Sequence, residues 1–361
     1  MDSRSALNDG NKWHSTHKIY GTLSELHTAR AASERRMESL PVPSVQAMVA
    51  ATGGAHVPPR YLRPEVAADA VASDGEAAIP IIDFERLLLH HPEEEEACRG
   101  ESARLHAACQ EWGFFQLINH GVPDDVIEGM KANIEAFFGL PAETKQQFAQ
   151  ERGQLEGYGQ LFVVSEDQKL DWADILYLNT QPPEHRNMRF WPDKPDTLRS
   201  ALDAYSAAVK TVADRLLGLM SISLGLPPEG IASKCGGGGI QSVQGLQVKR
   251  QDGSWVPVRP LEGAFVVNVG DILQIFTNGR YRSVEHRAVI NAERARLSVA
   301  AFHSPSIHAT IGPLLTDQEP MYKTVDHQSF MRLFFSAKLE GKSFLQRMKL
   351  NLDTASATTT N

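Results

Sequence analysis

Residues 236 to about 305 are built from short strand-like runs separated by glycine-containing turns, and this pattern restricts the fold more than any other feature. Four consecutive glycines lead into IQSVQGLQVKRQDGSWVPVRPLEGAFVVNVGDILQIFTNG, in which the runs alternate with Gly, Asp-Gly and Asn-Gly turns. The runs SVEHRAVI and RLSVAAFHSP continue the pattern, and the residues beyond 325 have a helical character. The sequence therefore predicts a β-rich C-terminal part that is closed by a helix.

The preceding part of the chain combines helices with a few strands. Strands are predicted at AIPIIDF, FFQLINHGV and DWADILYL, and helices at 101–113, from Pro123 to Gly139, and at 197–224. In the second helix one face is apolar, with Ile127, Met130, Ile134, Phe137 and Phe138. The third helix repeats apolar residues at helical spacing, namely Leu198, Leu202, Tyr205, Val209, Val212 and Leu216. The predicted fold class is mixed α/β (α+β).

Composition excludes several classes of partner. The net charge is -8 and no Lys/Arg cluster is present, which argues against nucleic acid. No apolar run approaches the about 18 residues that span a membrane, and residues 1–12 lack the apolar core of a signal peptide. The three cysteines, Cys98, Cys109 and Cys235, are too scattered for a disulfide scaffold and are interpreted as buried or incidental thiols. We expect a reduced, cytoplasmic protein.

The residues that carry chemistry lie near the end of the β-rich part. His286 stands in a strand-like run, and ten residues later Arg296 and Ser298 lie two apart, so both face the same side of a strand. An arginine among Val, Leu and Ala is costly to bury unless an anion pairs with it. Its planar fork suits a bidentate carboxylate, and serine adds a hydroxyl donor. Two structural interpretations stay open. His286 is a core or surface residue whose ring nitrogens are hydrogen-bonded within the fold, or Arg296 forms a salt bridge to a protein carboxylate.

The run from Gly245 to Pro305 resembles the plant 2-oxoglutarate/Fe(II)-dependent dioxygenases, close to the senescence-related-gene and norcoclaurine-synthase-like group. IPIIDF (79–84) and WGFFQLINHGV (112–122) resemble the N-terminal segment of the same family. The resemblance covers about residues 37–345. It implies a distorted jelly roll, or double-stranded β-helix, flanked by helices. It also implies oxidative decarboxylation of 2-oxoglutarate coupled to oxidation of a small molecule, with Fe(II), 2-oxoglutarate and ascorbate as cofactors.

The resemblance assigns roles to three residues. His286 matches the distal histidine of the iron-binding triad, which consists of two histidines and one carboxylate and leaves three positions for 2-oxoglutarate and O₂. Arg296 and Ser298 match the Arg-x-Ser pair that binds the far carboxylate of 2-oxoglutarate. His286 is thus assigned to metal binding and the other two to cofactor binding, and no catalytic residue is assigned.

The other two iron ligands of the family, a His-x-Asp pair, are absent. Their expected place, about 50–55 residues before His286, reads IASKCG, and no histidine occurs between His185 and His286. The family's Asn-Tyr-Tyr-Pro-Pro-Cys run, whose tyrosine contacts 2-oxoglutarate, is absent too. The join near Ser242–Val243 resembles an in-frame deletion of roughly 35 residues, so the jelly roll is expected to lack about two core strands. Iron binding is therefore expected to be weak or absent.

No other residues are expected to rebuild the triad. The only His-x-acid pair, His91-Pro92-Glu93, lies in the wrong half of the chain, in a run expected to be a solvated acidic loop. Asp252 and Asp271 are interpreted as turn residues. Candidate substrate contacts, by location only, are Phe162, Trp172, Leu176, Phe302 and Ser304, for each of which ordinary core packing is an equal interpretation.

The chain is divided into five segments by these signals. The predicted divisions are a largely disordered extension and linker (1–76), a non-haem dioxygenase N-terminal region (77–190), a long-helix region (191–235), a truncated Fe(II)/2-oxoglutarate β-core with its closing helix (236–345) and a disordered tail (346–361). MESLPVPSVQAM at 37–48 reads like a natural start, so residues 1–36 are interpreted as an upstream extension.

Three functional interpretations follow. The first is an oxygenase by descent that acts on a small specialised metabolite or hormone-like substrate and is inactive or severely impaired in this chain. The second is a non-catalytic pseudoenzyme that binds a dicarboxylate or another small molecule. The third is an unstable splice or gene-model variant. A monomer without nucleic-acid or membrane partners is expected in each case.

Overall fold

The computed structural model describes residues 16–23, 40, 42–73, 78–89, 91–151, 156–160, 163, 165–232, 236–241, 245–290, 295–306, 308–336 and 343–350 of the 361-residue chain. The strands are β1 (Thr16–Leu23), β2 (Ile81–Asp83), β3 (Phe114–Ile118), β4 (Gly157–Gly159), β5 (Ala173–Gln181), β6 (Gly236–Gln241), β7 (Leu246–Lys249), β8 (Trp255–Pro257), β9 (Phe265–Asn268), β10 (His286–Ala288), β11 (Arg296–His303), β12 (Thr310–Ile311) and β13 (Val325–Asp326). The α-helices are α1 (Val45–Thr52), α2 (Phe84–Leu87), α3 (Glu95–Ala107), α4 (Asp124–Phe138), α5 (Ala142–Gln146), α6 (Leu198–Ser223), α7 (Glu229–Ala232), α8 (Asp271–Phe276), α9 (His327–Ser336) and α10 (Ser343–Met348).

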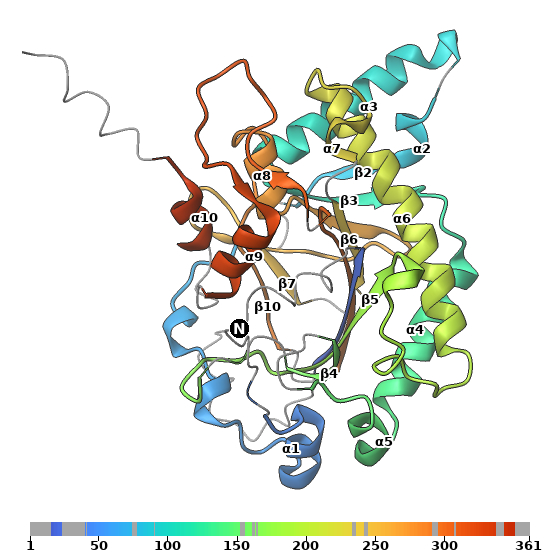
Figure 1. The fold of residues 1–361 in the computed structure, drawn as a ribbon, viewed down its shortest axis with the longest axis vertical. Coiled ribbons are helices and arrows are strands. Elements are labelled where there is room, and N and C mark those ends of the chain that lie inside the picture. The colour runs from blue at the N-terminus through green and yellow to red at the C-terminus, as the bar shows by residue number, and fades with distance from the viewer. Residues whose placement is uncertain are drawn as a thin grey trace, which may run out of the picture.

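The large sheet has the strand order β2-β3-β9-β6-β11-β1-β5-β4. β3, β9, β6 and β11 pair antiparallel in succession, whereas β1 runs parallel to both of its neighbours, β11 and β5. In Figure 1 the blue strand β1 lies beside β5 in the middle of the molecule. The large sheet therefore joins strands from the two ends of the chain.

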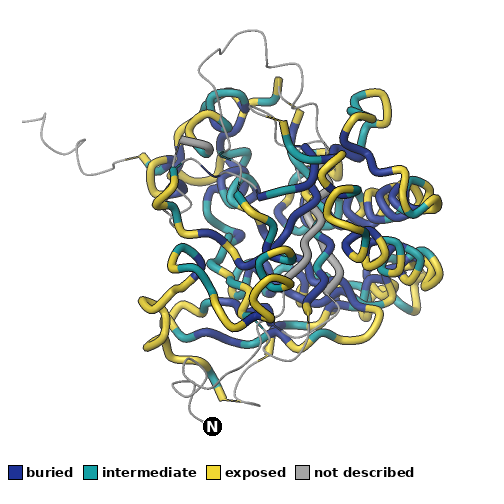
Figure 2. The backbone as a smooth tube through the Cα atoms, turned by 90° about the horizontal axis from the view of Figure 1, so that it is seen from below, coloured by how far each residue is buried: buried dark blue, intermediate teal, exposed yellow. Residues whose placement is uncertain are grey.

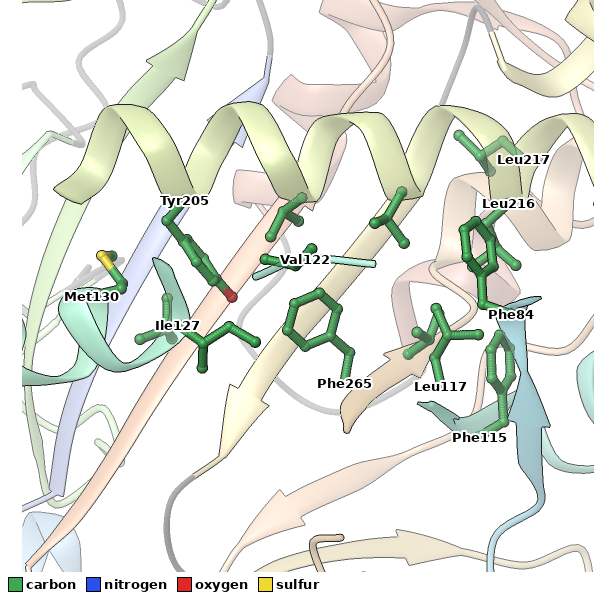
Figure 3. Close-up of a cluster of buried hydrophobic side chains, with 14 of the residues drawn as sticks. Phe84, Phe115, Leu117, Val122, Ile127, Met130, Tyr205, Leu216, Leu217 and Phe265 are labelled. Atoms are coloured by element: carbon green, nitrogen blue, oxygen red, sulfur yellow. The ribbon is translucent and has the colours of Figure 1, made fainter. Parts of the chain in front are cut away.

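Helices cover one face of this sheet and form the main hydrophobic core with it. The helices predicted from Pro123 to Gly139 and at 197–224 are confirmed as α4 and α6, and every residue of the predicted apolar face of α4 is buried. The helix predicted at 101–113 corresponds to the later part of α3 and the π-helical turn that follows it. From β11, Leu297 and Val299 enter the same core. Figure 3 shows the underside of α6 with Tyr205, Leu216 and Leu217 above Phe265 and Leu117 of the sheet. The buried stretches of the backbone run through the interior in Figure 2, and the exposed ones line the outer turns of the helices.

A second, smaller sheet has the order β10-β7-β8. It packs on the large sheet through a separate apolar cluster that joins Phe114 of β3 and Val266 of β9 to Leu246 and Val248 of β7. The C-terminal helices α9 and α10 pack with α8 in a third cluster around Phe276, Phe330 and Phe344. The predicted β-rich part and its closing helix are thus present.

The expectation of a largely disordered segment 1–76 is wrong for part of that range. Residues 16–23 form β1, and residues 45–52 form α1. The carboxylate of Asp174 in β5 accepts hydrogen bonds from Ser44 Oγ (3.0 Å), Val45 N (2.9 Å) and Gln46 N (2.9 Å). These bonds satisfy the free N–H groups at the start of α1, which are otherwise unpaired, and so attach the helix to the sheet.

Three local predictions also need correction. DILQIF, predicted as a strand-like run that begins with a turn residue, is helix α8, with Asp271 in its first turn, where the helix dipole favours an acid. The acidic run after Pro92 is not a loop, because a 3-10 turn (Pro92–Glu94) leads directly into α3. The tail boundary at 346 falls inside α10. Asp252 is confirmed as a turn residue, since its carboxylate accepts from Ser254 N at 2.9 Å.

Candidate functional site

His286 is the first residue of β10, at the edge of the small sheet. It pairs with Val248 of β7, and its ring meets that of Phe114 edge-on at a centroid distance of 5.2 Å. The residue is exposed, and its Nδ1 lies 3.4 Å from the carbonyl oxygen of Val284, which is at the limit of a hydrogen bond. The histidine is therefore held against an apolar surface with much of its side chain in solvent.

Arg296 and Ser298 are the first and third residues of β11. Their neighbours Leu297 and Val299 are buried in the main core, so Arg296 and Ser298 lie on the opposite face of the sheet. Arg296 is 3% exposed and Ser298 is partly buried. The predicted alternation is thus confirmed, and it puts a guanidinium and a hydroxyl on the face away from α6.

Gly245, which the sequence did not single out, connects this pair to the small sheet. A Cβ at residue 245 would lie 3.1 Å from Arg296 Cδ and 3.0 Å from the carbonyl oxygen of Val289. Its own carbonyl accepts a hydrogen bond from Val289 N at 2.7 Å. A Cβ at this position would therefore be tightly packed, and Arg296 or Val289 would have to shift by a few tenths of an ångström to admit it. The signal available in the sequence was a glycine immediately before a strand.

Strand β10 and the residues after it bring the histidine and the arginine to the same region of the molecule. Val289 lies beside Arg296 across Gly245, and His286 precedes Val289 by three residues, or about 10 Å along an extended chain. Within the described ranges, no group of three or more His, Cys, Asp or Glu side chains could hold a metal ion.

The part of the chain that the structure describes therefore does not supply the ligand cluster of an iron centre. A 2-His-1-carboxylate triad needs three protein ligands that converge on one point. His286 is one candidate ligand, and its surroundings are the Phe114 ring and the β7 backbone. By contrast, a buried arginine with a serine on the same face is chemically suited to a carboxylate.

The candidate substrate contacts are distributed unevenly. Leu176 is part of the main core, so the core-packing interpretation is confirmed for it. Phe302, on the same face of β11 as Arg296, is 46% exposed. Trp172 is buried against Tyr61, with ring centroids 5.0 Å apart, in a cluster that Ile290 joins from the end of β10. Phe162, Cys235 and the join at Ser242–Val243 lie outside the described residues.

Two further predictions concern the cysteines and membranes. Cys98 and Cys109 are free thiols, and burial raises the pKa of Cys109, which fits the interpretation of an inert buried thiol. None of the helices in the described part of the chain is long and apolar enough to cross a bilayer.

Two family descriptions match the chain. Residues 79–194 match the N-terminal region of the non-haem dioxygenases in morphine synthesis, and residues 239–305 match the 2OG-Fe(II) oxygenase superfamily. These ranges agree with the two segments on which the sequence resemblance rests.

Curated relatives and solved structures agree with these matches. The chain is 41% identical to 2-oxoglutarate-dependent dioxygenase 11 of Oryza sativa subsp. japonica, covering 89% of this chain and 99% of the relative. It is 43% identical to S-norcoclaurine synthase 1 of Coptis japonica, covering 86% and 97%. The crystal structure of JOX2 in complex with 2OG, Fe and JA superimposes with a TM-score of 0.73 at 29% identity, over 86% of this chain and 98% of that one. The distorted jelly roll predicted from the sequence is the fold of these oxygenases.

Proposed function

Because this chain belongs to the plant 2-oxoglutarate/Fe(II)-dependent dioxygenase family, we propose that it is such an oxygenase by descent and that its own catalysis is lost or severely impaired. Its ancestral substrate is a small molecule of the specialised-metabolite or hormone-like class. Relatives include a flavonoid 7-O-demethylase of Ocimum basilicum at 41% identity, and the JOX2 structure contains JA.

The observation that carries the proposal is the missing His-x-Asp pair, which would supply two of the three iron ligands. The chain has no histidine between His185 and His286, and the described residues contain no cluster of three potential ligands. Affinity for Fe(II) depends on ligand number and geometry, so one exposed imidazole holds the ion weakly. Without a bound metal the chain's residues supply no means of activating O₂.

The lengths of the alignments support the loss of an internal block. The alignment with the rice protein runs over 361 positions but takes in 89% of this 361-residue chain, so about 40 aligned positions have no residue here. The Coptis alignment runs over 349 positions and takes in 86%, which leaves a similar deficit. A block of this size is consistent with the roughly 35 residues inferred to be missing near Ser242–Val243.

The test is release of succinate by the full-length chain with Fe(II), 2-oxoglutarate and ascorbate. We expect no succinate above the enzyme-free control. A matched variant carries the corresponding segment of the rice relative between Ser242 and Val243, and it should regain turnover. Turnover of the unmodified chain at a rate close to that of the reinserted variant would refute the proposed loss of catalysis.

A second function is favoured by the retention of the Arg296–Ser298 pair. We propose, as the alternative, a pseudoenzyme that binds a dicarboxylate without chemistry. The buried guanidinium on the face away from α6 would hold a carboxylate through a bidentate contact, to which Ser298 adds a hydroxyl donor. Such charge-assisted bonds contribute about 1.5–3 kcal/mol each.

Calorimetry with 2-oxoglutarate distinguishes the alternatives. A binder should give heat that Arg296→Ala abolishes, whereas Arg99→Ala, which removes an exposed arginine paired with Glu95 on α3, should leave it unchanged. The absence of heat from all three proteins would eliminate the binder. An unstable variant without a role would instead show no soluble protein in the tissue that carries the transcript.

A further inference from the structure

Strand β1 is the feature of the fold that the family resemblance does not account for. It belongs to residues 16–23, upstream of both matched ranges, yet it lies inside the large sheet. Its register runs from Thr16 opposite Arg296 to Thr22 opposite Phe302 on one side, and from Thr16 opposite Ala173 to Thr22 opposite Asn179 on the other. Without it, the described sheet would be divided between β11 and β5.

The direction of β1 sets it apart from the strands around it. Jelly rolls are antiparallel architectures, and β3, β9, β6 and β11 follow that rule. β1 is parallel to both β11 and β5 in the interior of the sheet, whereas the other parallel pair, β2 with β3, lies at its edge. A strand that breaks the alternation on both sides, and comes from outside the matched segments, is a strand recruited into the sheet.

The backbone of β5 explains why a strand is needed in this position. Residues 173–180 are all buried, so their N–H and C=O groups need protein partners. On the outer side, β4 pairs only with Ile175–Tyr177, and Glu156 accepts from Asn179 N at 2.8 Å. On the inner side, β1 runs along the length of β5. Removing β1 would leave a long, buried and apolar edge, which is a template for aggregation.

We propose that Thr16–Leu23 is a replacement strand, which fills the slot between β5 and β11 that the missing block leaves open and on which the folded state of this chain depends. The proposal rests on the missing block inferred above but not on the loss of catalysis. The occupant is a segment of the same chain. Residues 24–44 connect β1 to α1, and 21 residues can extend to about 70 Å, so the connection does not limit the placement.

The sequence of the segment suits the role. THKIYGTL contains Thr, Ile and Tyr, which favour strands. It lies within residues 1–36, the polar extension that precedes MESLPVPSVQAM. If the proposal is correct, this extension is a structural part of the protein, and a chain that begins at Met37 lacks a strand of its large sheet.

The register provides a direct test by disulfide formation. Adjacent strands lie about 4.8 Å apart, within the range that a disulfide bridges. Thr22→Cys combined with Phe302→Cys joins directly paired positions. Lys18→Cys with the same Phe302→Cys is the matched control, because the two sites are on one face but four residues, about 13 Å, out of register. Both proteins are oxidised with glutathione, and the linked peptides are identified by mass spectrometry.

We expect the 22–302 disulfide as the main product within one chain, and no 18–302 disulfide. Equal cross-linking of both pairs, or of neither, overturns the assignment of β1 to this slot. Cross-links found between two chains in a covalent dimer also overturn it, since the occupant would then be a second copy. None of these readouts depends on oxygenase activity.

Truncation of the N-terminus tests whether folding depends on β1. Removing residues 1–14 leaves β1 in place and should change neither the thermal midpoint nor the solubility. Removing residues 1–23 deletes β1 and should cause aggregation or a midpoint lower by more than about 5 °C. A synthetic THKIYGTL peptide added during refolding should restore soluble protein, and a scrambled peptide should not. A 24–361 chain as soluble and stable as the 15–361 chain would overturn the proposal.

Discussion

Tyr205 of α6 buries a hydroxyl group in the main core, and this group has no hydrogen-bond partner among the described residues. The residue is 3% exposed, and its ring meets that of Phe265 edge-on at 6.4 Å. In Figure 3 the hydroxyl points away from α6, toward the side chains of Ile127 and Phe265. Burial raises the pKa of this phenol, so it stays neutral, but a neutral hydroxyl still loses its bonds to water on folding.

Replacing Tyr205 by Phe removes the unmatched polar group and keeps the ring. A buried polar group left unsatisfied costs about 1–3 kcal/mol, so we expect Tyr205→Phe to raise the free energy of unfolding by about 1 kcal/mol. For a domain of this size that corresponds to a rise in Tm of about 2 °C. Urea denaturation followed by circular dichroism gives the free energy directly, provided that the m-value is unchanged.

Tyr281 supplies the matched control. It is equally buried, and burial also raises its pKa, but its hydroxyl lies 2.9 Å from His106 Nδ1. Tyr281→Phe should therefore lower the free energy of unfolding by about 1 kcal/mol, because His106 loses its partner. A destabilisation by Tyr205→Phe as large as that by Tyr281→Phe would refute the reasoning, since it would require a bonding partner for Tyr205.

Three further predictions concern backbone strain, the attachment of α1 and pH. Gly113→Ala should lower the free energy of unfolding in urea by more than about 3 kcal/mol, since φ of Gly113 is +61° and a Cβ would overlap the Arg282 carbonyl. The control Gly121→Ala, with φ +74° and open space around the Cβ, should lower it by only about 1–2 kcal/mol. Equal losses of stability in the two variants would contradict the overlap at Gly113. Asp174→Asn should lower the free energy of unfolding by about 2 kcal/mol, because one amide oxygen cannot accept the three hydrogen bonds that the carboxylate accepts. The control is Asp193→Asn, at an exposed position. Similar small losses of stability in both variants would argue against the attachment of α1 through Asp174. Burial lowers the pKa of His303 to about 4 from 6.5, and within the described ranges its buried Nε2 has no hydrogen-bond partner. The folded state therefore disfavours the charged ring. As the pH drops from 6.5 towards 4, the free energy of unfolding of the wild type should fall by up to about 3 kcal/mol more than that of His303→Gln. Parallel stability–pH profiles of the two proteins would contradict this.

Several elements could be predicted from the sequence because their signals are local. The apolar spacing in α4 and α6 predicted their buried faces, and the two-residue spacing of Arg296 and Ser298 predicted a shared face of β11. A run such as DILQIF was ambiguous, since six residues of apolar character fit a buried strand or a short helix equally. Its helical state was decided by the packing of Leu273, Ile275 and Phe276.

The sequence by itself determined the family, the β-rich C-terminal part and the absence of the His-x-Asp ligands. Only the tertiary structure decided that Thr16–Leu23 lies between Arg296–Phe302 and Ala173–Gln181, that Asp174 caps α1, and that Gly245 makes room for Arg296. The physical reason is that side-chain periodicity depends on residues that are close together in the sequence. Backbone pairing and capping join residues more than a hundred positions apart, whose N–H and C=O groups are the same in every sequence.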